Sequence, residues 1–228
     1  KGSGMIHPSM ATMLSYITCD AGVDHALWSD MIRRVAESSF NTITVDGDTS
    51  TNDTFLAFSS GAELDTKYLS ILEEGLHLTA QYLAKAIARD GEGANCLLEI
   101  KVEGTQCDSD ARVIARTIAS SSLVKTAIHG SDPNWGRIIA ALGRAGIFFN
   151  LFDVQLWIGP YAIFSNGIPI AFDRQIVSNF MKARLRGEYL IDDLISIRVS
   201  VGRGKGSATA WGCDLSDQYV RINADYTT

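Results

Sequence analysis

A threonine near the front of the chain could supply both a nucleophile and a base. Thr12 follows the small residue Ala11 and precedes an apolar, β-prone run. In a chain cut between these two residues, the Thr12 hydroxyl could attack a carbonyl carbon while the freed α-amine accepted its proton. An α-amine has a pKa of about 7.7–8.0 and can act as a base near neutral pH, whereas a lysine amine, near about 10.4, would first need a lowered pKa. A small residue followed by threonine is also common without any catalytic role, so both interpretations of Ala11 and Thr12 stay open at this point.

A carboxylate lies between two glycines where the longest helical pattern ends. Glu92 stands between Gly91 and Gly93. Glycine is common as the C-terminal cap of a helix, which is a purely structural interpretation. A glutamate flanked by backbone without side chains could also approach a ligand closely. Both interpretations of Glu92 remain open at this point.

Two other motifs resemble binding loops only in part. The polar loop Asp46–Asp53 begins like a calcium-binding EF-hand, but Thr51 and Ala57 stand where the EF-hand needs glycine and glutamate. This loop is instead expected to form hydrogen-bonded turns. The stretch Gly202–Ser207 lacks the spacing of a phosphate-binding loop. Because it separates two strand-like runs, we expect a hairpin turn there.

Composition excludes several classes of protein. The chain has 228 residues, of which 46% are hydrophobic and 20% charged, and this balance is typical of a folded protein. A net charge of −6 without a dense Lys/Arg run argues against nucleic acid and acidic membranes as partners. The most apolar stretch, residues 138–152, carries Arg144, so we expect core rather than a membrane span. The four cysteines and four histidines show no metal-binding spacing. Reduced thiols and the lack of a secretory signal predict a cytoplasmic location, or an organelle matrix in a eukaryote.

Strand and helix patterns mix along the chain without regular βαβ alternation. We therefore expect an α/β (α+β) fold built from layers of mixed sheet and helix. Helical patterns cover residues 25–39, 65–89, 108–120, 133–143 and 173–186, the first capped by Asp24 and the third by Asp108 or Ser109. Strand patterns cover residues 13–19, 41–45, 55–58, 96–102, 154–158, 162–164, 195–201 and 208–212. A soft boundary is expected near 146–152.

Six motifs spread over the chain resemble one family, the ornithine acetyltransferases, also called glutamate N-acetyltransferases, of arginine biosynthesis. They are K-G-S-G-M-I-H-P-S-M-A-T-M-L at 1–14, V-D-G-D-T-S-T-N-D-T at 45–54, G-E-G-A at 91–94, D-P-N-W-G-R at 132–137, A-W-G-C-D-L-S at 210–216 and I-N-A-D-Y-T-T at 222–228. They follow the family's order from one end of the chain to the other.

The resemblance implies a precursor that cuts itself between Ala11 and Thr12. Residues 1–11 would be the tail of an α chain, and residues 12–228 a β chain headed by the nucleophile. The implied fold is an αββα sandwich like that of N-terminal-nucleophile enzymes, and the implied assembly is an α2β2 heterotetramer of α and β chains. The family's oxyanion hole, a Thr-Gly pair in the α chain, lies outside this sequence.

The resemblance also assigns a substrate site and a reaction. Thr12 would be catalytic, and the residues that contact substrate would be Lys1, Thr12, Glu92, Asn223 and Thr228. Lys1 suits a substrate carboxylate and Glu92 suits an amine. The implied reaction moves an acetyl group from N-acetylornithine to glutamate through an acetyl-threonine, without a cofactor or metal, and acetyl-CoA is a further possible donor. The alternatives are an N-terminal threonine amidase or aminopeptidase, and a non-catalytic binding protein that keeps the family's sequence.

Overall fold

Two sheets organise the part of the chain that the structure, a computed structural model, describes: residues 2–8 and 13–226. The larger sheet has six strands in the order β6-β5-β4-β7-β3-β8. Its strands are β3 (Leu97–Thr105), β4 (Gln155–Ile158), β5 (Tyr161–Ser165), β6 (Ile168–Pro169), β7 (Leu194–Ser200) and β8 (Gly206–Cys213). β3 and β7 run parallel, and the other neighbours are antiparallel, so the sheet is mixed.

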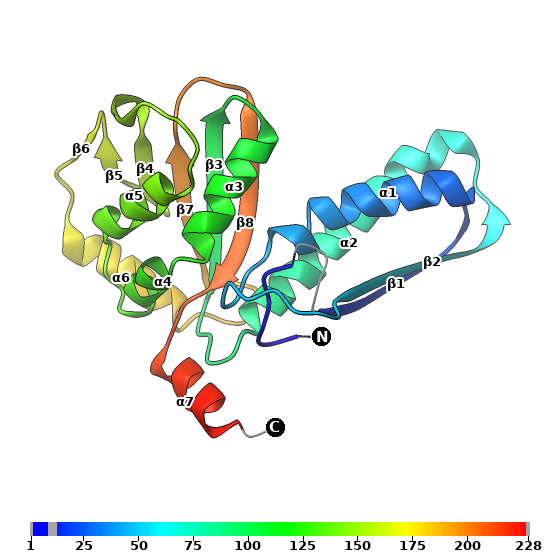
Figure 1. Ribbon diagram of the computed structural model, residues 1–228, viewed down its shortest axis with the longest axis horizontal. Helices are drawn as coiled ribbons and strands as arrows, with labels where there is room; N and C mark the ends of the chain where they lie inside the picture. Colours follow the sequence, from blue (N-terminus) through cyan, green and yellow to red (C-terminus); the bar gives the residue numbers. More distant parts are fainter. Residues whose placement is uncertain (1, 9–12, 227–228) are drawn as a thin grey trace.

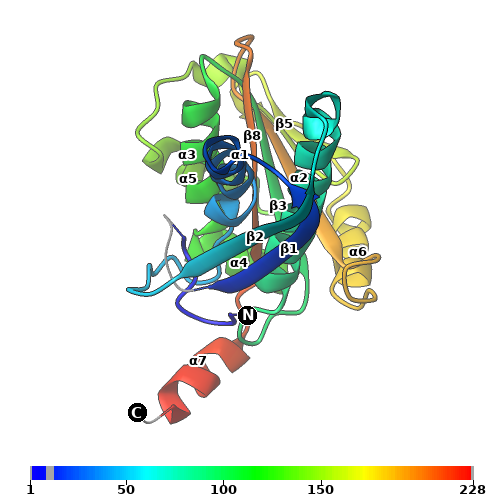
Figure 2. The same ribbon diagram turned by 90° about the vertical axis from the view of Figure 1, so that its right-hand side faces the viewer.

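Helices cover both faces of this sheet. They are α3 (Asp108–Ala119), α4 (Ser122–His129), α5 (Trp135–Arg144) and α6 (Arg174–Arg184), with a short 3-10 turn at Leu151–Asp153. In Figure 2, α3 and α5 lie on one side of the sheet and α6 on the other. One hydrophobic core, with residues from β3, α3, α5, β4, α6 and β7, joins these layers. It includes residues on both sides of the 146–152 connection.

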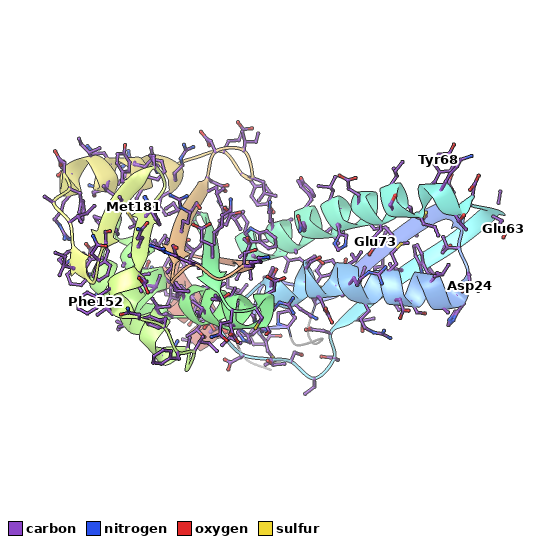
Figure 3. The ribbon with its side chains drawn as sticks, turned by 90° about the horizontal axis from the view of Figure 1, so that it is seen from above. Asp24, Glu63, Tyr68, Glu73, Phe152 and Met181 are labelled. Atoms are coloured by element: carbon purple, nitrogen blue, oxygen red, sulfur yellow. The ribbon has the colours of Figure 1, made fainter. Side chains whose placement is uncertain are left out.

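A second unit, here called the ribbon unit, extends away from the six-stranded sheet (Figure 1). It consists of β1 (Leu14–Gly22), α1 (His25–Glu37), β2 (Thr54–Glu63) and α2 (Leu69–Arg89), with 3-10 turns at Phe40–Thr42 and Thr66–Tyr68. β1 and β2 pair in parallel. Both helices lie along one face of the strand pair, and in Figure 3 Asp24 and Glu63 mark its far end. Arg34 of α1 forms a bidentate ion pair with Glu73 of α2, in which the two nitrogen–oxygen distances are 2.6 and 3.0 Å.

The two units meet where the segment that follows α1 contacts β8. The alternating pattern at residues 41–45 predicted a strand, and this prediction is wrong. The chain forms a 3-10 turn there, followed by one bridge from Ile43 to Trp211. The Thr44 N–H donates to the Trp211 carbonyl at 2.9 Å. Ile43 and Thr44 are fully buried between the units, so this alternation reflects packing against β8 rather than sheet pairing. Buried Lys125 of α4 also bridges the units by donating to the Val45 carbonyl.

Several sequence predictions are confirmed and others are wrong. Asp24 caps α1 as predicted, by accepting from two N–H groups. The 202–207 stretch is not a hairpin turn, because β3 lies between β7 and β8 and this connection crosses its end. Asp108 does not cap α3; it is the first residue of that helix, and its carboxylate accepts the Ser207 N–H at 2.8 Å instead. Two helices, α4 and α7 (Asp217–Asp225), were not predicted from the sequence. The layered, mixed α/β class is confirmed.

The described segment before β1, residues 2–8, is held against the 44–49 loop. The Asp46 carboxylate accepts the Met5 N–H at 2.6 Å and the Ile6 N–H at 3.0 Å. The Ile6 carbonyl accepts the Val45 N–H at 2.6 Å, and the Ile6 side chain is fully buried. His7 contacts the Thr44 hydroxyl at 2.9 Å through Nδ1. Burial, aided by nearby Arg116, lowers the pKa of His7 to about 4, so its ring is neutral at neutral pH.

A buried carboxylate anchors the turn between α2 and β3 to the end of β8. Asp214 accepts from the backbone N–H groups of Asn95 and Cys96 at 2.7 and 3.1 Å. Its other oxygen accepts from the Asn95 amide at 2.9 Å and lies 2.9 Å from His129 Nδ1. Since Asp214 is almost fully buried, these bonds replace the water that its charge would otherwise need.

Replacing this anchor is expected to destabilise the fold strongly. Asp214→Ala should lower the free energy of unfolding by about 3–5 kcal/mol, because the buried Cys96 N–H and the partly buried Asn95 N–H both lose their acceptor. The matched control is Asp217→Ala, which removes an exposed i,i+4 ion pair with Arg221 and should cost less than about 0.5 kcal/mol. Urea unfolding of the full-length protein measures both. A loss for Asp214→Ala within about 1 kcal/mol of the control would contradict the anchoring role.

Candidate functional site

A cavity of about 790 Å³ opens where the segment at residues 2–5, the turn after α2 and helix α7 come together. It is also bordered by the first residues of β1 and by the 46–53 loop. Its lining residues are Gly2, Ser3, Gly4, Met5, Met13, Leu14, Asn52, Glu92, Ile222, Asn223 and Tyr226. The residues come from the two ends and the middle of the sequence, so only the folded chain can form this cavity.

The turn at residues 91–94 presents Glu92 to the cavity. Gly93 has a φ of +71°, a left-handed conformation that reverses the chain directly after Glu92. The Glu92 N–H donates to the Ser3 carbonyl at 2.9 Å, which ties the turn to the segment at residues 2–5. That segment crosses the carboxylate at Gly4, where a Cβ atom would lie 2.6 Å from Glu92 Oε1. The G-x-G around residue 3 therefore allows the backbone to pass over the carboxylate.

Asn223 of α7 completes a polar pair with Glu92. Its amide Nδ2 donates to Glu92 Oε2 at 2.7 Å and to the Tyr219 carbonyl at 3.0 Å. Both partners are acceptors, so the amide nitrogen is assigned to this side and the amide oxygen remains a further acceptor. Glu92 forms no ion pair with any residue in the described ranges 2–8 and 13–226. A carboxylate and an amide oxygen side by side form a site suited to an ammonium group.

Helix α7 is fixed against the turn by its own cap. Ser216 caps α7 by accepting the Gln218 N–H at 3.2 Å, and its hydroxyl donates to the Gly93 carbonyl at 2.7 Å. The same carbonyl accepts from the Asn95 amide at 3.2 Å. The Glu92 turn and the helix that carries Asn223 therefore share hydrogen bonds. The rest of α7 projects away from both units (Figure 1).

Tyr219 of α7 lies beside the cavity near two acidic side chains, Asp46 and Glu92. The Tyr219 hydroxyl donates to Asp46 Oδ2 at 3.4 Å. Burial, together with the negative charges of Asp46 and Glu92, raises the pKa of Tyr219 to about 12. Tyr219 therefore stays protonated as a donor to Asp46, the same carboxylate that holds the backbone at residues 5 and 6. The Tyr219–Asp46 contact therefore helps to hold α7 and the segment at residues 5 and 6 together beside the cavity.

The structure brings together two of the residues named from the sequence, Glu92 and Asn223. Lys1, Ala11, Thr12 and Thr228 lie outside the described residues. Sequence reasoning missed several lining residues, namely Gly4, Met13, Asn52, Ile222 and Tyr226. All five fall inside motifs that carried the family resemblance, and that was their one available signal.

Residues 2–8 and 13–226 contain no group of three or more His, Cys, Asp or Glu side chains placed to hold a metal ion. Within the same residues, no helix combines the length and the apolar character needed to cross a membrane.

Comparison with known proteins gives a consistent result. The model of the ArgJ family matches residues 1–228. The chain is 86% identical over 228 residues to the arginine biosynthesis bifunctional protein ArgJ of Prochlorococcus marinus strain NATL2A, covering all of this chain and 54% of that protein. It is 60% identical to the protein of the same name from strain MIT 9313, covering 53% of it. The chain thus spans about half the length of the curated relatives it matches.

A solved structure shows the same fold. The crystal structure of arginine biosynthesis bifunctional protein argJ from Bacillus halodurans superposes with a TM-score of 0.86 at 39% sequence identity. The match covers 94% of this chain and 100% of that one. Because the family model matches residues 1–228, the relatives are similar in sequence and the fold is shared, the chain belongs to the ArgJ family.

Proposed function

We propose that this chain is the β-chain portion of a glutamate N-acetyltransferase that moves the acetyl group of N-acetylornithine to glutamate. The observation that carries the proposal is the Glu92–Asn223 pair, an ammonium-binding arrangement in a cavity bordered by Met13, the residue after Thr12. Membership of the ArgJ family supports the same activity, since the relatives are named as arginine biosynthesis proteins. Lys1, Thr12 and Thr228 complete the proposed substrate site with Glu92 and Asn223.

The proposed mechanism uses one nucleophile in two half-reactions. The Thr12 Oγ attacks the acetyl carbonyl of N-acetylornithine, and the Thr12 α-amine takes its proton. Ornithine leaves with that proton on its amine, and the acetyl group stays on Thr12 as an ester. The amine of glutamate then attacks the ester, and Thr12 Oγ recovers a proton. The side-chain ammonium of the ornithine donor binds at Glu92 and the amide oxygen of Asn223, while Lys1 binds a carboxylate.

Two further features follow from the same family. The relatives are called bifunctional, and we propose acetylation of glutamate from acetyl-CoA as the second reaction. No cofactor is proposed for either reaction. We also propose a cytoplasmic location in a bacterium, because the relatives come from bacteria.

We propose that self-cleavage between Ala11 and Thr12 leaves residues 1–11 on an α chain and residues 12–228 as the β chain. The ribbon unit offers a surface for the remainder of the α chain. The two helices α1 and α2 leave one face of the strand pair uncovered (Figure 1), and large apolar side chains of the two strands are exposed. They are Leu14, Tyr16, Leu56 and Phe58, which are 38–55% exposed. Relatives about twice as long as this chain have the additional sequence to cover it, and we propose an α2β2 assembly.

The competing functions differ in what accepts the acyl group. A self-processing threonine amidase or aminopeptidase would transfer it to water and release free acetate. A non-catalytic relative would form no acyl-threonine. The Glu92–Asn223 pair supports a donor that carries a cation. The products then decide between glutamate and water as the acceptor.

Mass spectrometry of the full-length precursor tests the proposal. After incubation with N-acetylornithine, we expect a chain beginning at Thr12 that carries one additional acetyl group, and native spectra should show an α2β2 assembly. Glutamate should then remove the acetyl group and yield N-acetylglutamate. Thr12→Ala should leave the precursor uncut and unacetylated. Free acetate in place of N-acetylglutamate would support a hydrolase, and an uncut wild-type chain without an adduct would contradict the proposal.

Substitution of Glu92 tests how the donor is bound. Glu92→Gln keeps the shape and the bond to Asn223 but removes the charge, so the KM for N-acetylornithine should rise about 10–100-fold. The KM for glutamate should change less, because the glutamate side chain carries no cation. Steady-state kinetics of the mature enzyme measure both values, with exposed Glu74→Gln as the control. Equal changes in the two KM values, or none, would argue against the assigned role.

A further inference from the structure

Arg116 of α3 is a half-buried cation to which neither the fold nor the proposed acetyl transfer gives a partner. Its Nε is hidden from solvent without a hydrogen-bond acceptor, and the side chain forms no ion pair among residues 2–8 and 13–226. A buried donor without an acceptor is costly and uncommon in native proteins. Arg89, also half-buried, shows the usual solution, because it binds the Asp193 carboxylate and the Ala94 carbonyl.

A second unpaired cation lies one helical turn away. Arg112 precedes Arg116 by four residues, so the two side chains occupy one face of α3. Burial, and then the positive charge of Arg112, lower the pKa of Arg116. Arg112 forms no ion pair within the described residues either, and Asp108, one turn before it, accepts the Ser207 N–H at 2.8 Å. Two like charges at this spacing are unfavourable unless an anion lies between them.

The chain itself gives this arginine pair no carboxylate. The loop at residues 46–49 approaches the end of α3, because a Cβ atom on Gly47 would lie 3.9 Å from the Ser120 Cβ. Asp46 of this loop already accepts three backbone N–H groups, and Asp48 forms no ion pair with any described residue. The residues outside the described ranges are Lys, Ser, Met, Ala and Thr, and none of these types has a carboxylate side chain.

A partner from the rest of the full-length protein would satisfy the pair. The chain covers 54% of its relative from strain NATL2A, so a large part of such a protein lies outside it. Because Arg116 is partly exposed, a group from outside the chain can reach its guanidinium. A guanidinium matches a carboxylate, to which it donates two parallel hydrogen bonds. A phosphate of acetyl-CoA would leave after each turnover and return Arg116 to its unpaired state, whereas a side chain of the same protein stays.

We propose that Arg112 and Arg116 together bind one Asp or Glu side chain of the rest of the α chain. The carboxylate accepts hydrogen bonds from Arg116, and Arg112 adds a second positive charge beside it. This contact lies on α3 of the six-stranded unit and is separate from the apolar strand face of the ribbon unit. The inference rests on the two-chain protein proposed above and adds a charged anchor between its chains.

The rate at which the two chains separate tests the inference on the mature, full-length protein. Arg116→Met keeps much of the apolar stem but removes the guanidinium. In moderate urea, size-exclusion chromatography should show the α chain leaving the β chain about 30-fold faster than in the wild type, because the carboxylate is left unpaired. The matched control, Arg203→Met at an exposed arginine, should separate within about twofold of the wild type. Unchanged separation of the Arg116→Met protein would overturn the inference.

A series of double variants distinguishes an ion pair from damage to the fold. Each Asp and Glu of the α chain is changed to Asn or Gln, alone and together with Arg116→Met. One of these changes should speed separation as much as Arg116→Met does and add little to it in the double variant. Additive effects at every carboxylate would overturn the inference.

Two further outcomes are distinguishable in the same proteins. If Arg116→Met raises the KM for acetyl-CoA about 10-fold or more while the chains separate at the wild-type rate, the pair binds a phosphate and the inference is overturned. A wild-type precursor that remains one uncut chain on a denaturing gel would instead contradict the proposed function.

Discussion

The structure depends on a backbone contact between residues far apart in sequence: residues 3–5 crossing the Glu92 turn. The Glu92 N–H donates to the Ser3 carbonyl, Gly4 lies against the carboxylate, and Asp46 accepts the Met5 N–H. A side chain at Gly4 would collide with Glu92, so the contact depends on residue type as well as on fold. It brings the chain segment before β1, the turn after α2 and, through Asn223, the C-terminal helix to one cavity.

The two units of the fold serve this contact in different ways. The six-stranded sheet fixes the Glu92 turn and α7 through the buried Asp214 and through Ser216, which bonds to Gly93. The ribbon unit fixes the start of β1, because Leu14 pairs with Thr54 and places Met13 beside the cavity. Ile43 and Lys125 join the units by packing on β8 and by a buried bond to Val45. A site built at such a junction needs both cores to be intact.

The sequence alone predicts those elements whose signals are local. Asp24 gave the start of α1, the leucine repeat gave α2, and β-prone runs gave β4, β5, β7 and β8. It fails where tertiary packing decides. Ile43 and Thr44 alternate because they are buried against Trp211, and the 202–207 loop crosses β3 because of strand order, which no local pattern encodes. For the site, motif resemblance indicated Glu92 and Asn223. Their hydrogen bond and the passage of Gly4 over the carboxylate required coordinates.

The central claim is that the cavity between residues 2–5, Glu92 and α7 binds an amino acid through its ammonium group. A crystal structure of the mature two-chain protein with ornithine would test it most directly. The account predicts ornithine in this cavity, with its side-chain nitrogen within hydrogen-bond distance of Glu92 and of the Asn223 amide oxygen. Ornithine bound elsewhere, for example in the groove between β1 and α2 near Ile17 and Leu72, with the Glu92–Asn223 pair unoccupied, would contradict the claim.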